Sequence, residues 1–176
     1  MYGGDLVEVA DAGARFADPR HPYTRVLMGA IPATDPSERG QTAELAGEVP
    51  DPADPPPGCR FHPRCSAVVQ ADALELPTDV WQRAFEFRVD VEAGSVDGND
   101  GDPASIRAEY GLEGELPPDA VDSVDEAVRA VANGEDERAV EIVRDVFPTP
   151  CASEDPGLRE TPAGHEAACH HYGPGE

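Results

Sequence analysis

The stretch that decides the architecture covers residues 55–65 and reads Pro55-Pro56-Pro57-Gly58-Cys59-Arg60-Phe61-His62-Pro63-Arg64-Cys65. Proline cannot continue a helix or occupy a central strand, so the prolines before Gly58 predict an extended, stiff connector that ends at the first cysteine. Pro63 predicts a further turn between the two cysteines. We therefore expect a loop that holds Cys59 and Cys65 in tight backbone turns, of the kind that surround a buried metal.

The four cysteines of the chain form two pairs, Cys59 with Cys65 and Cys151 with Cys169. Thiols stay reduced in the cytosol, so a metal site is favoured over disulfides there. Four thiolates suit either zinc in a closed tetrahedral site or an iron–sulfur cluster. The residues alone leave two alternatives open: cysteines that are simply buried in the core, and a nucleophilic pair of Cys169 with His165.

The charge composition excludes several functions. The chain has 13 basic residues, all arginine, against 36 acidic residues, and its net charge is −23. Without lysine it can form neither a phosphate-binding P-loop nor a Schiff base. The acidity argues against a nucleic-acid partner and against an anionic membrane surface. No apolar stretch predicts a membrane span or a signal peptide, so we expect a cytoplasmic protein without direct membrane insertion. Diffuse acidity without lysine is typical of proteins from a high-salt cytosol.

Short regular elements are expected in the N-terminal part of the chain. Residues 6–9 predict a short strand after a Gly-Gly turn, and residues 11–16 predict one or two helical turns. A helix is expected over residues 21–31, with Pro22 in its first turn. A second strand is expected over residues 43–49.

Residues 66–150 differ from the rest of the chain, because they carry 21 acidic residues and 6 arginines, a net charge of −15. Apolar residues recur at helical spacing over residues 79–93, 119–132 and 135–147. Residues 94–102 predict a flexible linker. We therefore expect a small, loop-rich α+β fold with an acidic, mainly helical insertion, and with its loops held by a four-cysteine metal site.

Several motifs resemble the C-terminal region of oligopeptide/dipeptide ABC transporter ATP-binding subunits. They are His21-Pro22-Tyr23-Thr24-Arg25, Ala30-Ile31-Pro32, Gly47-Glu48-Val49-Pro50, residues 56–65, and Gly164-His165-Glu166-Ala167-Ala168-Cys169-His170. Residues 1–8 resemble the last strands of the nucleotide-binding domain. The resemblance covers nearly all of residues 1–65 and 151–171. The acidic composition and the expanded loop resemble those of family members from a haloarchaeal lineage.

The resemblance implies a part in ATP-driven peptide import, with an ATP-binding subunit and permease subunits as partners, at the inner face of the cell membrane. The P-loop, signature and Walker B motifs of the family have no counterpart here, so we expect no ATPase activity from this chain. It would be the accessory domain of a truncated or split subunit. The expected divisions are a remnant of the nucleotide-binding domain over 1–20, the accessory domain over 21–65 and 151–172, and the insertion over 66–150.

The resemblance also implies a cofactor. Its metal ligands, carried over by position, are Cys59, Cys65, Cys151 and Cys169, holding a [4Fe-4S] cluster, with zinc as the alternative. ATP would bind only to the intact family member. An alternative function is a stand-alone four-cysteine zinc module that binds a protein partner.

Overall fold

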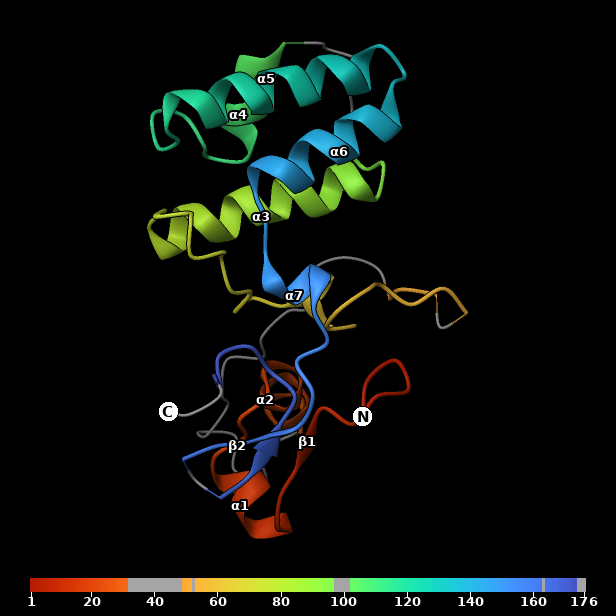
Figure 1. Ribbon diagram of the computed structural model, residues 1–176, viewed down its shortest axis with the longest axis vertical. Coiled ribbons are helices and arrows are strands. Elements are labelled where there is room, and N and C mark those ends of the chain that lie inside the picture. The colour runs from red at the N-terminus through yellow and green to blue at the C-terminus, as the bar shows by residue number, and fades with distance from the viewer. Residues whose placement is uncertain (32–48, 52, 97–101, 163, 174–176) are drawn as a thin grey trace. The chain divides into compact units, whose positions relative to one another are not determined.

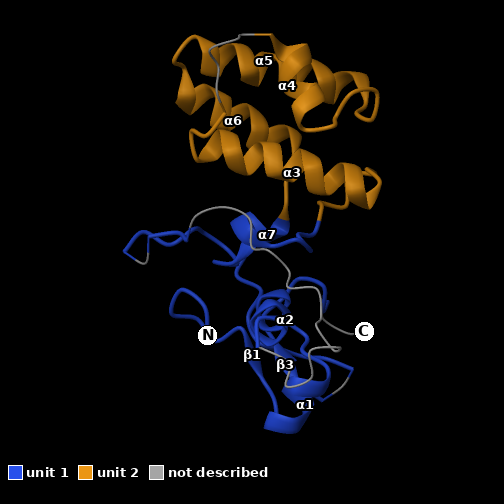
Figure 2. Cartoon of the chain, turned by 180° about the vertical axis from the view of Figure 1, so that it is seen from behind, with its two compact units in different colours: residues 1–69, 150–176 blue, residues 70–149 orange. Residues whose placement is uncertain are grey.

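The chain consists of two compact units, each of which is described by itself (Figure 2). The computed structural model describes residues 1–31, 49–51, 53–96, 102–162 and 164–173. Unit 1 comprises Met1–Val69 and Pro150–Glu176, and unit 2 comprises Gln70–Thr149. Helices together with one small sheet confirm the expected mixed α+β class. The strand expected over 43–49 lies, apart from Val49, outside the described residues.

Unit 1 joins the two ends of the sequence in one small sheet. Its elements are β1 (Glu8–Val9), α1 (Ala12–Ala17), α2 (Pro22–Gly29), the 3-10 helix η2 (His62–Arg64), α7 (Pro150–Ser153), β2 (Arg159–Glu160) and β3 (Glu166–Ala167). The strands run antiparallel in the order β1-β3-β2. Glu8 lies opposite Ala167, which in turn lies opposite Arg159. The sheet therefore connects β1, near the start of the chain, to the segment that precedes Cys169.

Helix α2 begins where the sequence predicts, because Pro22 occupies its first position and needs no backbone N–H there. The residue before it, His21, caps the helix: its ring Nδ1 accepts the N–H of Tyr23 at 3.1 Å. The neighbouring strand is shorter than expected, since only Glu8 and Val9 of residues 6–9 pair in the sheet.

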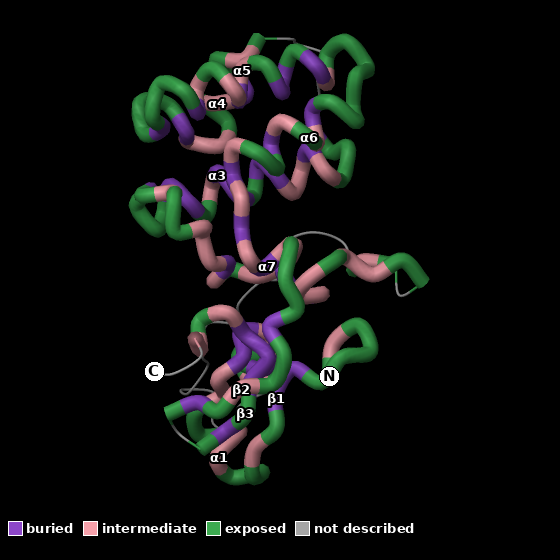
Figure 3. The backbone as a smooth tube through the Cα atoms, viewed as in Figure 1, coloured by how far each residue is buried: buried purple, intermediate pink, exposed green. Residues whose placement is uncertain are grey.

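Unit 2 is a set of four packed helices, α3 (Thr78–Glu92), α4 (Pro103–Glu109), α5 (Pro118–Ala132) and α6 (Asp136–Val146). Helix α5 packs against α4 and α6, and α3 packs against α6 (Figure 1). Buried positions recur at helical spacing along α3, α5 and α6, where Figure 3 shows purple segments. On α5 they include Ala120, Val124, Ala127 and Val128. This periodicity confirms the three helices expected from the sequence.

Two helices of unit 2 end at a glycine. Gly94 after α3 and Gly134 after α5 have φ of +65° and +73°, which glycine adopts without strain. Beyond α3, the N–H of Ser95 donates to the carbonyl of Asp90 at 2.8 Å, closing a Schellman turn. The sequence did not predict α4, and residues 97–101 of the expected linker lie outside the described residues.

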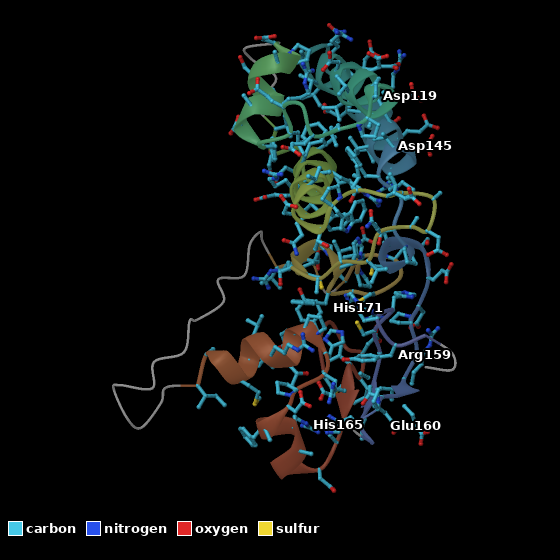
Figure 4. The ribbon with its side chains drawn as sticks, turned by 90° about the vertical axis from the view of Figure 1, so that its left-hand side faces the viewer. Asp119, Asp145, Arg159, Glu160, His165 and His171 are labelled. Atoms are coloured by element: carbon cyan, nitrogen blue, oxygen red, sulfur yellow. The ribbon has the colours of Figure 1, made fainter. Side chains whose placement is uncertain are left out.

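The six arginines of unit 2 each pair with a carboxylate of the same unit. The pairs are Arg83 with Asp79, Arg88 and Arg144 with Glu92, Arg107 and Arg129 with Asp125, and Arg138 with Glu126 and Glu135. Carboxylates such as Asp119 and Asp145 lie on the outside of the helices (Figure 4). Each arginine charge of unit 2 is thus neutralised by a nearby carboxylate, and the remaining carboxylates leave the surface of this unit negatively charged.

No helix within the described ranges is both long enough and apolar enough to span a membrane.

Candidate metal centre

A backbone hydrogen bond connects the two cysteine-bearing regions of unit 1. The N–H of Cys59 donates to the carbonyl of Cys151 at 2.9 Å. Gly58, just before it, has φ of +66°, and a Cβ at this position would lie 2.5 Å from the Cys151 carbonyl oxygen. Only glycine lets the two backbones approach this closely. The glycine that ends the run of prolines therefore determines how Cys59 meets Cys151.

The first cysteine pair lies on a tight turn, as the prolines predict. The carbonyl of Cys59 accepts the N–H of His62 at 2.9 Å and contacts the His62 ring Nδ1 at 2.8 Å. The N–H of Cys65 then donates to the carbonyl of His62 at 3.2 Å, at the end of η2. His62 is buried and acts as a structural part of this turn.

The last cysteine lies on a loop that contacts the other two cysteine-bearing segments. The His171 ring Nε2 lies 2.6 Å from the carbonyl oxygen of Ala67, two residues after Cys65. The His170 ring Nε2 lies 3.0 Å from the carbonyl oxygen of Glu154, just beyond α7. These histidines hold the loop of Cys169 against its neighbours.

Each of the four thiols receives a backbone N–H hydrogen bond. The donors are Phe61 and His62 for Cys59, Ala67 for Cys65, Val69 for Cys151 and His171 for Cys169. The bond from Val69 to the Cys151 sulfur measures 3.5 Å. Three of these four thiols accept an N–H from the residue two positions further along the chain. Such donors favour the thiolate, which is the form that binds metals.

Burial opposes thiolate formation at the same place. Burial raises the pKa of Cys59 to about 11 and that of Cys65 to about 12, and it also raises the pKa of Cys169. Negative charge on Cys151 would raise all three pKa values further, which places the four sulfurs in one electrostatic neighbourhood. A cation bound among them would supply the missing positive charge. The donor set of four thiols with N–H donors fits zinc or an iron–sulfur cluster.

All four cysteines are free thiols. In the described part of the chain, no group of three or more His, Cys, Asp or Glu side chains is arranged to hold a metal ion. The four-cysteine metal site therefore stays a prediction, supported by the shared neighbourhood and the N–H donors.

A buried acid–base cluster lies in the same unit and was missed by the sequence interpretation. The side chain of Glu8 is 1% exposed, and its carboxylate Oε1 lies 3.4 Å from the ring Nδ1 of His165. Figure 4 labels His165 in unit 1. This contact gives no support to a nucleophilic pair of His165 with Cys169. A glutamate placed within the apolar run of residues 6–9 was the available signal.

Comparison with known proteins divides the chain at nearly the same place as its fold. Residues 7–71 match the family described as Oligopeptide/dipeptide transporter, C-terminal region. Residues 78–164 match the family described as Domain of unknown function (DUF8228). The first match confirms the resemblance over residues 7–65 and extends to residue 71, whereas the resemblance of residues 151–171 remains a prediction.

The curated relatives are peptide transporter ATP-binding proteins. The chain is 47% identical over 77 residues to the probable peptide ABC transporter ATP-binding protein y4tS of Sinorhizobium fredii, covering 44% of this chain and 22% of the relative. It is 46% identical over 65 residues to the dipeptide transport ATP-binding protein DppF of Escherichia coli, covering 37% and 20%. The chain thus spans about a fifth of the length of these relatives.

No solved structure matches the chain significantly. The similarity of the chain thus rests on sequence: residues 7–71 are similar to the C-terminal region of oligopeptide/dipeptide transporter ATP-binding proteins, and residues 78–164 are similar to a domain of unknown function.

Proposed function

We propose that unit 1 is an accessory domain of a peptide ABC importer and that Cys59, Cys65, Cys151 and Cys169 bind a metal cofactor in it. The match of residues 7–71 to the C-terminal region of oligopeptide/dipeptide transporters carries the proposal. The domain would act beside ATP-binding and permease subunits at the inner face of the cell membrane. It would take no part in ATP hydrolysis itself. The diffuse acidity and the absence of lysine would adapt the protein to a salt-rich, haloarchaeal-like cytosol.

The proposed cofactor is a [4Fe-4S] cluster, with zinc as the alternative. Unit 1 needs additional stabilisation because its sheet consists of two-residue strands and its longest helix has 8 residues. A bound metal contributes folding free energy directly, which a small unit with a limited apolar core requires. The N–H donors to the thiols support the same role, because they stabilise negatively charged sulfur.

A series of cysteine variants tests the cofactor proposal. Serine at each of the four cysteine positions should lower the bound iron or zinc at least tenfold, because each variant removes one of four ligands. Ser66→Ala, next to Cys65, is the control and should retain the metal. Variants that keep the metal content of the unchanged chain would contradict the proposed ligand set.

An exposed apolar surface supports the partner proposal. Within the described residues, the large apolar side chains that remain exposed all belong to unit 1. They are Met1, Leu6, Val9, Phe16, Leu27, Ile31, Val49 and Leu158. Leu6 and Leu158 line a pocket of about 210 Å³ that also reaches Cys59. Apart from Gln70 and Ala71, unit 2 lies outside the transporter match, and it has no such exposed side chain among its described residues. Leu6 and Leu158 line the same pocket, so we propose this pair as part of the contact with a partner.

A chimera tests the transport role. The region of DppF that corresponds to residues 7–71 is removed, and this chain is fused to the remaining ATP-binding protein in Escherichia coli lacking DppF. We expect the chimera to restore dipeptide-dependent growth that the shortened DppF alone does not restore. Leu6→Ser with Leu158→Ser should reduce the recovery, whereas Leu27→Ser, exposed on α2, is the matched control. A stable, expressed chimera that performs no better than the shortened protein would refute the role.

A further inference from the structure

Four polar side chains in unit 1 are buried. Glu8 of β1 is 6% exposed, His21 before α2 is 1% exposed, Thr24 of α2 is 5% exposed and His165 before β3 is 3% exposed. Buried polar groups are costly unless they are hydrogen-bonded, so their partners indicate what the cluster holds in place.

The Glu8 carboxylate is surrounded by donors. Its Oε1 accepts the N–H of Arg20 at 3.0 Å, and its Oε2 accepts the N–H of His21 at 2.9 Å. The Thr24 hydroxyl and the His165 ring add further hydrogen bonds. Although burial raises the pKa of Glu8, these donors outweigh it and leave the pKa below its usual value. The carboxylate thereby fixes the backbone immediately before α2.

His21 uses both of its ring nitrogens. Nδ1 accepts the N–H of Tyr23, so it carries no proton, and the other nitrogen is left to donate to the carbonyl of Ala168. The N–H of Ala168 donates to the carbonyl of Val7 at 2.9 Å. Both peptide groups that flank Ala168 are therefore held, one by Val7, just before β1, and one by His21, and the next residue is Cys169.

We propose that His21, oriented by Glu8, is a positioning residue that fixes the thiol of Cys169 by holding the carbonyl of Ala168. That carbonyl belongs to the peptide bond shared with Cys169, so its rotation would move the thiol directly. The value of this positioning rests on the proposed four-cysteine site, but the placement of the thiol is measurable in metal-free protein.

Two variants of His21 separate capping from positioning. Asparagine is a favoured helix cap, so His21→Asn retains an acceptor for the Tyr23 N–H, but its shorter side chain does not also reach Ala168. His21→Ala loses both interactions. Val143→Ala, a buried change in unit 2, controls for general destabilisation.

The measurement is the rate of N-ethylmaleimide modification of each cysteine in the metal-free chain, resolved by peptide mass spectrometry. In His21→Asn we expect Cys169 to react about tenfold faster, because one buried hydrogen bond restraining it is lost. Cys59, Cys65 and Cys151 should change by less than about threefold, as local opening does not involve them. Glu8→Gln should reproduce the selectivity, and Val143→Ala should leave Cys169 unchanged.

An unchanged Cys169 rate, or an equal acceleration of all four thiols, would overturn the proposal. The outcome does not depend on the cofactor. If the wild-type chain bound no metal but His21→Asn selectively exposed Cys169, the metal site would fail and the positioning role would stand.

Discussion

Replacing Gly58 by alanine should disrupt the contact between the two cysteine-bearing regions. The added Cβ would lie 2.5 Å from the Cys151 carbonyl oxygen and 2.9 Å from the carbonyl carbon of Ala152. Both are backbone atoms that cannot rotate away. We therefore expect separation of the Cys59 N–H from the Cys151 carbonyl and a weaker unit 1.

The magnitude follows from two separate costs. A φ of +66° costs an alanine about 1 kcal/mol, and forcing extra atoms into a packed contact costs about 1–3 kcal/mol more. The expected loss is about 3 kcal/mol in the free energy of unfolding of unit 1. Gly157→Ala is the matched control, because Gly157 has φ of +58° but nothing within 4 Å of the added Cβ, so it should lose only about 1 kcal/mol.

Urea unfolding of the metal-free protein measures the difference. Near-ultraviolet circular dichroism follows tyrosine packing, which in unit 1 includes Tyr2 and Tyr23 with ring centroids 4.9 Å apart. Fluorescence of Trp81, the one tryptophan of the chain, follows unit 2 separately and should not change. Equal losses for Gly58→Ala and Gly157→Ala would refute the close-approach argument.

Three further predictions concern acid, salt and the helical unit. The lowered pKa of Glu8 gives stability that is present above its unfolded value near 4.5 and is lost as the pH falls through the folded value. Burial lowers the pKa of His21 to about 4, so the stability that its neutral ring provides is lost as the pH falls from 6.5 towards 4. The urea midpoint of unit 1 should therefore fall over this pH range, and it should fall less in His21→Asn. Molar KCl should raise the melting temperature, because it screens repulsion within a net charge of −23; a transition that loses cooperativity as salt is raised would contradict this. Val143→Ala removes a fully buried side chain of α6 and should cost unit 2 about 2 kcal/mol by Trp81 fluorescence; a loss below about 0.5 kcal/mol would show that this core is loosely packed.

The helices of unit 2 could be predicted from the sequence because their signals are local. Proline starts, glycine stops and apolar spacing lie within each segment, as Pro118, Gly134 and the buried face of α5 show. Helix α4 escaped prediction because its 7 residues are too few to display a helical period.

The elements of unit 1 depend on partners far away in the sequence. A two-residue strand is too short to show an alternation of apolar and polar residues. Strand β1 forms only because β3, which lies 157–159 residues later in the sequence, pairs with it. The cysteines could be selected from the sequence as candidate ligands, whereas the donors to their sulfurs come from backbone conformation. The cluster of Glu8, His21 and His165 could not be predicted for the same reason, since its members meet only after folding.

The most direct test of the four-cysteine centre is the metal content of the full chain, purified without oxygen and without added chelators. Iron, acid-labile sulfide and zinc are quantified per chain, together with the visible absorption spectrum. We expect either about four iron and four sulfide with a brown colour, or about one zinc without colour. A folded chain that contains neither metal, and whose melting temperature does not change when iron and sulfide or zinc is added, would contradict the four-cysteine centre.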